Sequence, residues 1–145
     1  MTALTDFPGQ TYDKLRYGDT DRQGHINNAV FTSLYETGRV SILHHEGQKL
    51  AALDHSFVLA RIAIDYRAEM FWPGLVQIGT GVKLVGTSSI TFAQALFQDG
   101  KCVSTAESVV VQVNAETRRA APISPAARDK LASLIIAFYT NPRRQ

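Results

Sequence analysis

An apolar stripe with helical spacing marks the segment from Asn27 to about Glu46. The stripe consists of Val30, Phe31, Leu34, Tyr35, Ile42 and Leu43. Side chains three or four positions apart share one face of an α-helix, so this spacing predicts a long helix with one buried side. Gly38 inside it favours close packing of the helix backbone against a neighbouring element. Gly47 is a natural residue at which the helix ends.

Beyond residue 55 the apolar positions recur every second residue, which is the period of a β-strand. Four strands are predicted, within segments 56–70, 74–86, 89–98 and 101–114. Asp99-Gly100 is a strong signal for a two-residue hairpin, and Gly86-Thr87 predicts the hairpin before it. Because the four strands follow one another through short turns, we expect them to form an antiparallel meander.

The alternation within these strands predicts which side chains face the helix. In the first strand the apolar face is expected to hold Val58, Ala60, Ile62, Ile64 and Tyr66, with Arg61, Asp65 and Arg67 on the opposite face. In the second strand Val76, Ile78, Val82 and Leu84 are expected to share one face. The long helix must bury its stripe, and the sheet is the only large surface available for it.

These elements predict an α+β fold. A short strand is expected in residues 12–19, ahead of the helix, which makes an antiparallel five-stranded curved sheet wrapped around one long central helix. Ser124-Pro125 has the pattern of an N-cap followed by proline at the first helical position, and predicts a last helix that extends to about Tyr139.

Bulk composition narrows the class of protein. The chain has 145 residues, of which 45% are hydrophobic and 19% charged, as expected for one globular domain over residues 1–145. Its net charge of +2 is too small to indicate a nucleic-acid partner. No apolar stretch approaches the length of a membrane span, and no secretory signal is visible. With one cysteine, Cys102, no intrachain disulfide is possible, and we expect a cytoplasmic protein.

The densest group of polar residues, "RYGDTDRQGHINNAVF", directly precedes the long helix. Acids, glycine and asparagine are ordinary turn and capping residues there, and Asp19 is interpreted as structural. A calcium loop of the EF-hand type is excluded, because Val30 occupies its twelfth position, where a carboxylate is needed. Zinc-protease, dinucleotide, phosphate-loop and serine-hydrolase motifs are also incomplete, and no metal site is predicted.

The same segment offers a site for carbonyl chemistry. Free N–H groups at the start of a helix favour negative charge and can hold the oxygen of a carbonyl under attack. A carboxylate on the preceding loop can act as general base or nucleophile. Asp21, His25, Asn27 and Asn28 supply this set within eight residues.

The stretch "YGDTDRQGHINNAVFTSLYETGRV" resembles the signature of the 4-hydroxybenzoyl-CoA thioesterase family of hotdog-fold acyl-CoA thioesterases. In that family an aromatic residue, Gly or Ala, and Asp-x-Asp-x-x-Gly precede the central helix. The later "VNAETRRAAPIS" extends the resemblance over nearly the whole chain. The resemblance implies a hotdog fold and hydrolysis of an acyl-CoA thioester. No cofactor is implied, since coenzyme A is part of the substrate.

The resemblance also implies roles for individual residues. Asp21 matches the family's catalytic carboxylate, which attacks the thioester carbonyl or activates water. Asn28, seven residues on, matches the position of the backbone oxyanion donor. His25 matches a histidine of plant acyl-acyl-carrier-protein thioesterases, whereas Gln23 stands where those enzymes have asparagine. Gln23, Gly24 and Asn27 are expected to contact substrate.

Substrate class follows from the departures from the family pattern. The 4-hydroxybenzoyl enzymes have aromatic residues where Asn27 and Asn28 stand, so a fatty acyl or other acyl chain is expected instead of benzoyl. Arg61, Arg67 and Arg118 are candidates for the phosphates of coenzyme A, although a solvated sheet face explains each of them equally well. Glu36 and Arg39 are spaced for a pair on the helix surface, and we interpret them as residues that support the site from behind or lie at a subunit interface.

Other functions remain open at this point. The thioester carrier is either coenzyme A or an acyl-carrier protein. A hotdog hydratase would have a D-x-N-P-x-H pattern with five residues from Asp to His, whereas Asp21 and His25 are four apart and the proline is missing. A non-catalytic acyl-CoA-binding module is a further alternative. The resemblance implies a homodimer or homotetramer, which would also cover an exposed sheet edge.

Overall fold

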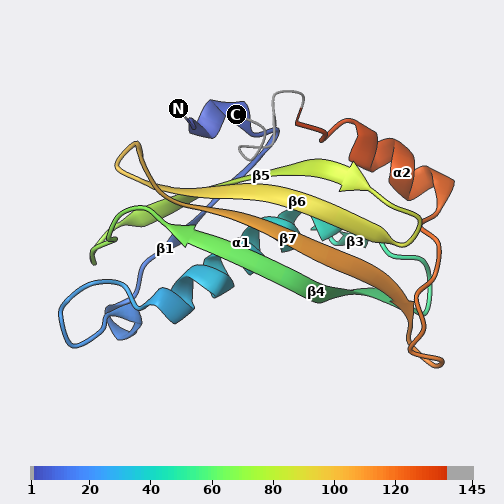
Figure 1. Cartoon of the computed structure of the whole chain (residues 1–145), viewed down its shortest axis with the longest axis horizontal. Helices are drawn as coiled ribbons and strands as arrows, with labels where there is room; N and C mark the ends of the chain where they lie inside the picture. The colour runs from blue at the N-terminus through green and yellow to red at the C-terminus, as the bar shows by residue number, and fades with distance from the viewer. Residues whose placement is uncertain (1, 137–145) are drawn as a thin grey trace.

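Five antiparallel strands form one twisted sheet in the computed structural model, which describes residues 2–136 (Figure 1). The strands, in spatial order, are β1 (Gly9–Lys14), β5 (Leu75–Val85), β6 (Ser89–Gln98), β7 (Lys101–Asn114) and β4 (His55–Tyr66). The five-stranded antiparallel sheet predicted from the sequence is therefore confirmed.

The predicted meander of four consecutive strands is wrong, because β4 pairs with β7 and not with β5. The chain crosses the ends of β7 and β6 between β4 and β5. On this path the N–H of Ala68 donates to the carbonyl of Val103 at 3.1 Å, and the N–H of Phe71 donates to Gln98 Oε1 at 3.0 Å. These bonds hold the connection across the sheet end, so β4 and β1 form the two edges.

The two predicted hairpins are present. Asp99 and Gly100 have φ values of 51° and 78°, which is the left-handed pair that a type I′ turn requires. Between β5 and β6 the N–H of Gly86 donates to the carbonyl of Ser89 at 2.8 Å. The meander is therefore confirmed for β5, β6 and β7.

The long helix α1 (Asn28–Leu43) begins where the sequence predicts it, with Asn27 as its N-cap. It ends earlier than the predicted Glu46. His44 instead opens β2 (His44–His45), which pairs with β3 (Gln48–Lys49). Glu46 and Gly47 join them with φ values of 51° and 76°, and two left-handed residues in succession cannot continue a helix.

Helix α1 packs on one face of the sheet and takes part in two apolar clusters. The first joins its N-terminal half to the sheet and contains Phe31, Leu34, Tyr35, Val76, Ile78 and Leu96. The second joins Leu43 to Val82, Phe92 and Val110 and to the short helix α2 (Pro125–Ala132). On the opposite face, Phe7 and Ile136 cover Ala93, Ala95 and Phe97. Two short 3-10 turns, at Leu4–Asp6 and Tyr17–Asp19, complete the described elements.

A β-bulge in β4 changes the predicted pattern of side chains. Leu59 pairs with Val110, but Arg61 pairs with the next residue on β7, so Ala60 is the extra residue. A bulge shifts the alternation by one position. Ile62 and Ile64 pack on the core as predicted, whereas Val58 is 40% exposed and Phe57 packs inward in its place.

A second β-bulge changes which side chains of β5 face the core. The register shifts between Val82 and Leu84, so Lys83 is the extra residue. Val76, Ile78 and Val82 are buried as predicted, but Leu84 is 62% exposed. A two-residue period in the sequence does not reveal where a bulge occurs. The burial of Leu84 was therefore predicted incorrectly.

The last helix begins at the predicted cap, where Ser124 Oγ accepts a hydrogen bond from the N–H of Ala127 at 3.2 Å. It ends at Ala132, well before the predicted Tyr139, and residues 137–139 lie outside the described part of the chain. Arg39 is buried between the two clusters, so it does not form the helix-surface pair that its spacing from Glu36 predicts.

Candidate active site

A tight loop precedes α1 and presents the predicted catalytic residues. The N–H of Asp21 donates to the carbonyl of His25 at 2.8 Å, and the N–H of Gly24 donates to the carbonyl of Asp21 at 3.1 Å. Gly24 adopts a φ of 84°, a conformation that glycine permits without strain. The loop is therefore closed by its own backbone, and Gly24 is needed for its shape.

The Asp21 carboxylate is oriented by this loop. Its Oδ1 atom accepts hydrogen bonds from the N–H of Gln23 at 2.9 Å and from the N–H of His25 at 3.1 Å. Within residues 2–136, Oδ2 accepts no hydrogen bond. The side chain is thus held by one oxygen, and the other is available for chemistry.

Asp19, two residues earlier, has a structural role, as predicted. Its carboxylate is buried and accepts hydrogen bonds from the backbone N–H of Arg16 at 2.9 Å and from the Arg16 guanidinium at 3.1 Å. Its carbonyl accepts from the N–H of Asn27 at 2.9 Å. These contacts tie the loop to the helix cap.

His25 lies beside the Asp21 loop and is half-buried. Its Nδ1 atom is 3.3 Å from Glu69 Oε1. The ring meets Phe71 edge to face, with ring centroids 5.3 Å apart. Both contacts come from the connection between β4 and β5, so this connection fixes the orientation of the imidazole.

The first turn of α1 provides the polar end of a helix. Asn27 Oδ1 accepts from the N–H of Ala29 at 3.0 Å and so caps the helix. Asn28 is the first helical residue, and its N–H has no acceptor within the helix. The Tyr66 hydroxyl donates to the Asn28 carbonyl at 3.3 Å, and its ring packs against Phe31 with centroids 5.0 Å apart.

A cleft of about 410 Å³ joins these groups. It is lined by Asp21, Gln23, His25, Ile26, Asn28, Phe31, Tyr66, Arg67, Ala68 and Glu69. Five of the residues predicted from the sequence meet here: Asp21, Gln23, His25, Asn28 and Arg67. Gly24 and Asn27 act through the loop and the cap and do not line the cleft. Sequence reasoning missed Phe31, Tyr66 and Glu69 as site residues. Tyr66 and Glu69 reach the cleft because β4 pairs with β7, which places the end of β4 beside the start of α1.

Two predicted substrate-binding arginines lie elsewhere in the chain. Arg61 Nη1 is 3.8 Å from Glu107 Oε1 on the sheet face away from α1. Arg118 adopts a φ of 61° in the turn after β7, near Asn114, which pairs with the start of β4. Within one chain, neither lines the cleft.

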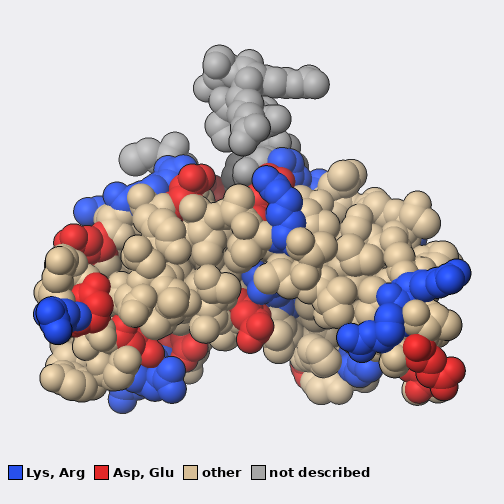
Figure 2. All heavy atoms as spheres, turned by 60° about the horizontal axis from the view of Figure 1, so that its bottom comes forward, with Lys and Arg blue, Asp and Glu red and all other residues tan. Residues whose placement is uncertain are grey.

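Charged side chains of both signs are mixed on the molecular surface. On the face shown in Figure 2, Lys and Arg side chains are interspersed with Asp and Glu. Among residues 2–136, no helix is long and apolar enough to cross a bilayer. In the same range, no group of three or more His, Cys, Asp or Glu side chains is placed to hold a metal ion.

The chain is similar in sequence and structure to proteins that are named as thioesterases. Acyl-CoA thioester hydrolase YbgC of Escherichia coli O6:H1 is 27% identical over 117 residues, which cover 78% of this chain and 84% of that protein. The structure of a predicted thioesterase from Bacillus stearothermophilus is 30% identical, with a TM-score of 0.78 over 87% of this chain and 95% of that one. A thioesterase from Thermus thermophilus, complexed with coenzyme A and Zn, is 28% identical, with a TM-score of 0.76 over 89% of this chain and 95% of that one.

The family model that matches the chain covers residues 15–131, from the start of the Asp21 loop to the last turn of α2. This range includes the whole cleft and four of the five strands. The fold is therefore hotdog-like, and the chain is a thioester hydrolase. It belongs to the Thioesterase-like superfamily.

Proposed function

We propose that the protein is an acyl-CoA thioesterase in which Asp21 activates the attack on the thioester and the start of α1 holds the oxyanion. One observation carries this proposal: a single cleft joins the free Oδ2 of Asp21 to the first turn of α1. The E. coli relative is named as an acyl-CoA thioester hydrolase and the T. thermophilus structure contains coenzyme A, which supports this substrate class.

The chemistry needs no metal or redox cofactor, because a thioester is already an activated acyl group. In the general-base route, water attacks the carbonyl carbon while Asp21 Oδ2 takes its proton. The backbone N–H of Asn28 and the dipole of α1 stabilise the negative oxygen that forms. The C–S bond then breaks, the thiolate of coenzyme A leaves and takes up a proton, and the free acid remains. In the nucleophilic route, Asp21 itself attacks the carbonyl carbon, the C–S bond breaks and the thiolate of coenzyme A leaves; water then cleaves the resulting anhydride into the free acid and the Asp21 carboxylate.

Other residues of the cleft have binding roles in this proposal. Arg67 carries the positive charge that would meet the phosphates of coenzyme A, and Phe31 and Tyr66 form an apolar wall for the acyl chain. Gln23 presents its amide to the same cleft. The polar start of α1 at Asn27 and Asn28 favours an aliphatic acyl group over an aromatic one.

The test of function is a free-thiol release assay with acyl-CoA esters of graded chain length. We expect turnover that depends on chain length and is saturable. Thiol release from acyl-carrier-protein thioesters, with none from acyl-CoA esters, would show that the acyl group of the substrate is carried by acyl-carrier protein. Binding of acyl-CoA without release of thiol from either carrier would instead show a binding module and refute the enzymatic proposal.

His25→Ala is expected to lower kcat by about tenfold, less than a change at Asp21, because His25 positions water and does not carry the proton. The His25→Gln variant, which can still hydrogen-bond water, should recover part of the loss. The two variants are compared by steady-state kinetics across pH. A loss of kcat in His25→Ala as large as that of an Asp21 variant would show that the imidazole is itself the base.

The protein is further proposed to act as a homodimer or homotetramer. Edge strand β4 is 12 residues long and leaves Val58, Leu59 and Tyr66 between 40% and 48% exposed. A long edge with apolar side chains is usually covered by a partner. Sedimentation equilibrium measures this directly, and a monomer at micromolar concentration would contradict the assembly.

A further inference from the structure

The side chain of Gln98 acts as a strand-like neighbour for the backbone of Phe71. Its Oε1 atom accepts a hydrogen bond from the N–H of Phe71 at 3.0 Å, and its Nε2 atom donates to the Phe71 carbonyl at 2.7 Å. Gln98 is the last residue of β6, whereas Phe71 belongs to the connection between β4 and β5. One amide therefore satisfies both backbone polar groups of Phe71, as a neighbouring strand would.

Phe71 lies opposite His25 in an isolated antiparallel bridge. Beside this bridge the N–H of Ile26 donates to the carbonyl of Met70 at 2.9 Å. A hydrogen bond at this place marks the non-hydrogen-bonded type of pair, in which the two opposed side chains lie close together. The imidazole of His25 accordingly meets the Phe71 ring edge to face, with ring centroids 5.3 Å apart.

The same ladder continues on the other side of His25. In a non-hydrogen-bonded pair the backbone groups of the two residues point away from each other. The N–H of His25 donates to Asp21 Oδ1 at 3.1 Å, and its carbonyl accepts from the N–H of Asp21 at 2.8 Å, whereas the backbone of Phe71 bonds to Gln98. Gln98 thus ends a row that begins at Asp21 and passes through His25 and Phe71.

Gln98 is placed to act on the cleft only through the residues that it holds. It does not line the cleft, and its side chain carries no charge. The fold leaves room for its amide at Gly74, where a Cβ atom would lie 3.2 Å from Gln98 Nε2. The contact of this amide with the connection is therefore closely fitted.

We propose that Gln98 is a positioning residue for thioester hydrolysis: its amide fixes Phe71, and the Phe71 ring fixes the imidazole of His25. The inference rests on the proposed role of His25 in positioning water. A displaced imidazole holds this water less well, and a small displacement of a positioning group lowers the rate of the chemical step. Because Gln98 lies outside the cleft, the effect falls on kcat and leaves KM unchanged.

Gln98→Ala is expected to lower kcat by about threefold to tenfold, which does not exceed the loss expected for His25→Ala. The double variant of Gln98 and His25 to alanine should have the kcat of His25→Ala alone, since without the imidazole there is nothing left to position. Gln10→Ala is the matched control. Gln10 Nε2 also donates to backbone carbonyls, those of Leu4 at 3.2 Å and Phe7 at 3.1 Å, but outside the cleft. Its kcat should equal that of the wild type in the thiol-release assay.

The NMR signals of the His25 ring protons give a second measurement, which does not depend on activity. They are assigned by their loss in His25→Ala. In the wild type the adjacent Phe71 ring shifts them, and in Gln98→Ala they are expected to move toward the positions of an exposed histidine. Gln10→Ala should leave them in place. A wild type that releases no thiol would refute the proposed function, and the NMR comparison would then decide by itself whether Gln98 positions the imidazole.

Unchanged kcat or unchanged His25 signals in Gln98→Ala would overturn the proposal. So would losses from Gln98→Ala and His25→Ala that multiply in the double variant, because Gln98 would then act independently of the imidazole. Should Gln98→Ala fail to fold, Gln98→Glu takes its place. An ionised glutamate still accepts from the N–H of Phe71 but cannot donate to its carbonyl, and wild-type kcat in that variant would refute the role of the amide.

Discussion

Asp21→Asn is expected to lower kcat by a factor of about 10² to 10⁴ while the protein remains folded, the range for loss of a positioned general base. Asparagine keeps an oxygen that accepts the hydrogen bonds of Gln23 and His25, at 2.9 and 3.1 Å in the wild type, so the loop before α1 should keep its shape. The change removes only the carboxylate that takes the proton of water. Thiol release and thermal unfolding are measured on the same preparation.

The control for this change is Asp99→Asn, which makes the same substitution in the turn between β6 and β7. Asp99 has a φ of 51° and lies outside the cleft, and asparagine tolerates this backbone conformation well. Its kcat should equal that of the wild type. Turnover of Asp21→Asn close to the wild-type rate would refute the catalytic assignment, whereas a fall in both variants would point to a general effect of charge.

The mechanism can be resolved further with the wild type. In a single turnover in ¹⁸O-labelled water, label found in the Asp21 carboxylate would show nucleophilic attack through an anhydride. Label confined to the released acid would show that water attacks the acyl carbon, as the general-base route requires. Because Oδ1 is held by two backbone N–H groups, Oδ2 is the atom expected to act in either case.

Local patterns in the sequence were sufficient to predict the elements but not their order in the sheet. The turn signals at Asp99-Gly100 and Gly86 depend on backbone conformation at single residues, and both hairpins formed. The position of β4 depends on long-range pairing with β7 and on the path of the segment 67–74 across the sheet end. A short-range period in the sequence carries no information about such a pairing, so the position of β4 in the sheet was predicted incorrectly.

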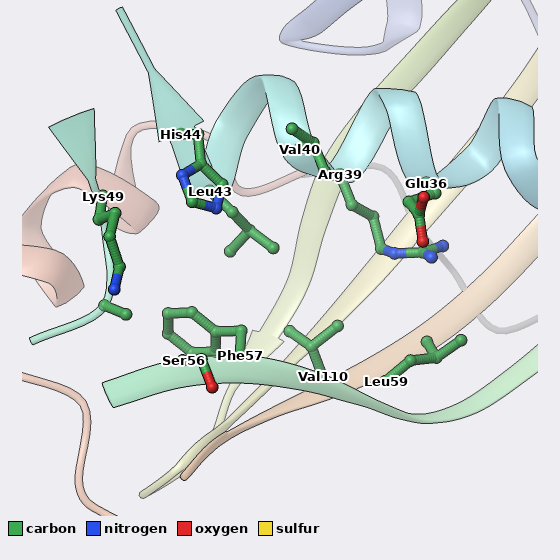
Figure 3. A pocket seen from close by; sticks show the side chains of 11 residues that line it. Glu36, Arg39, Val40, Leu43, His44, Lys49, Ser56, Phe57, Leu59 and Val110 are labelled. Carbon is green, nitrogen blue, oxygen red and sulfur yellow. The ribbon is translucent and has the colours of Figure 1, made fainter. Parts of the chain in front are cut away.

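The candidate site shows the same division between local and long-range information. Asp21, Gln23, His25 and Asn28 lie within eight residues, and a helix start close behind a tight loop must bring them together. Tyr66 and Glu69 join them only because β4 ends beside α1. Arg39 was placed on the surface because its spacing from Glu36 suits a helix pair, but its side chain extends from α1 toward the sheet (Figure 3) and lies between two apolar clusters.

Gly38→Val is expected to destabilise the protein by about 3 kcal/mol or more, because it forces a side chain into a closely packed contact. A Cβ atom at this position would lie 2.6 Å from Gln94 Nε2, 2.6 Å from Thr80 Oγ1 and 2.7 Å from Ile78 Cγ2. These atoms belong to the buried strands β5 and β6, so relief requires α1 to move away from the sheet. The close packing inferred from a glycine inside a helical pattern is thus confirmed, and it is the reason why the stability cost of glycine in a helix is accepted here.

Gly38→Ala separates the two effects of this glycine. Alanine gains about 1 kcal/mol of helix propensity over glycine, yet it introduces the same clashing Cβ atom, so a net loss of about 1 to 2 kcal/mol is expected. Gly18→Ala is the matched control, because a Cβ atom there meets nothing within 4 Å. Its free energy of unfolding should change by less than about 0.5 kcal/mol. Chemical denaturation of the three variants measures these differences. A stabilised Gly38→Ala would show that α1 can shift on the sheet, and the close approach of helix and sheet would then not be what selects glycine.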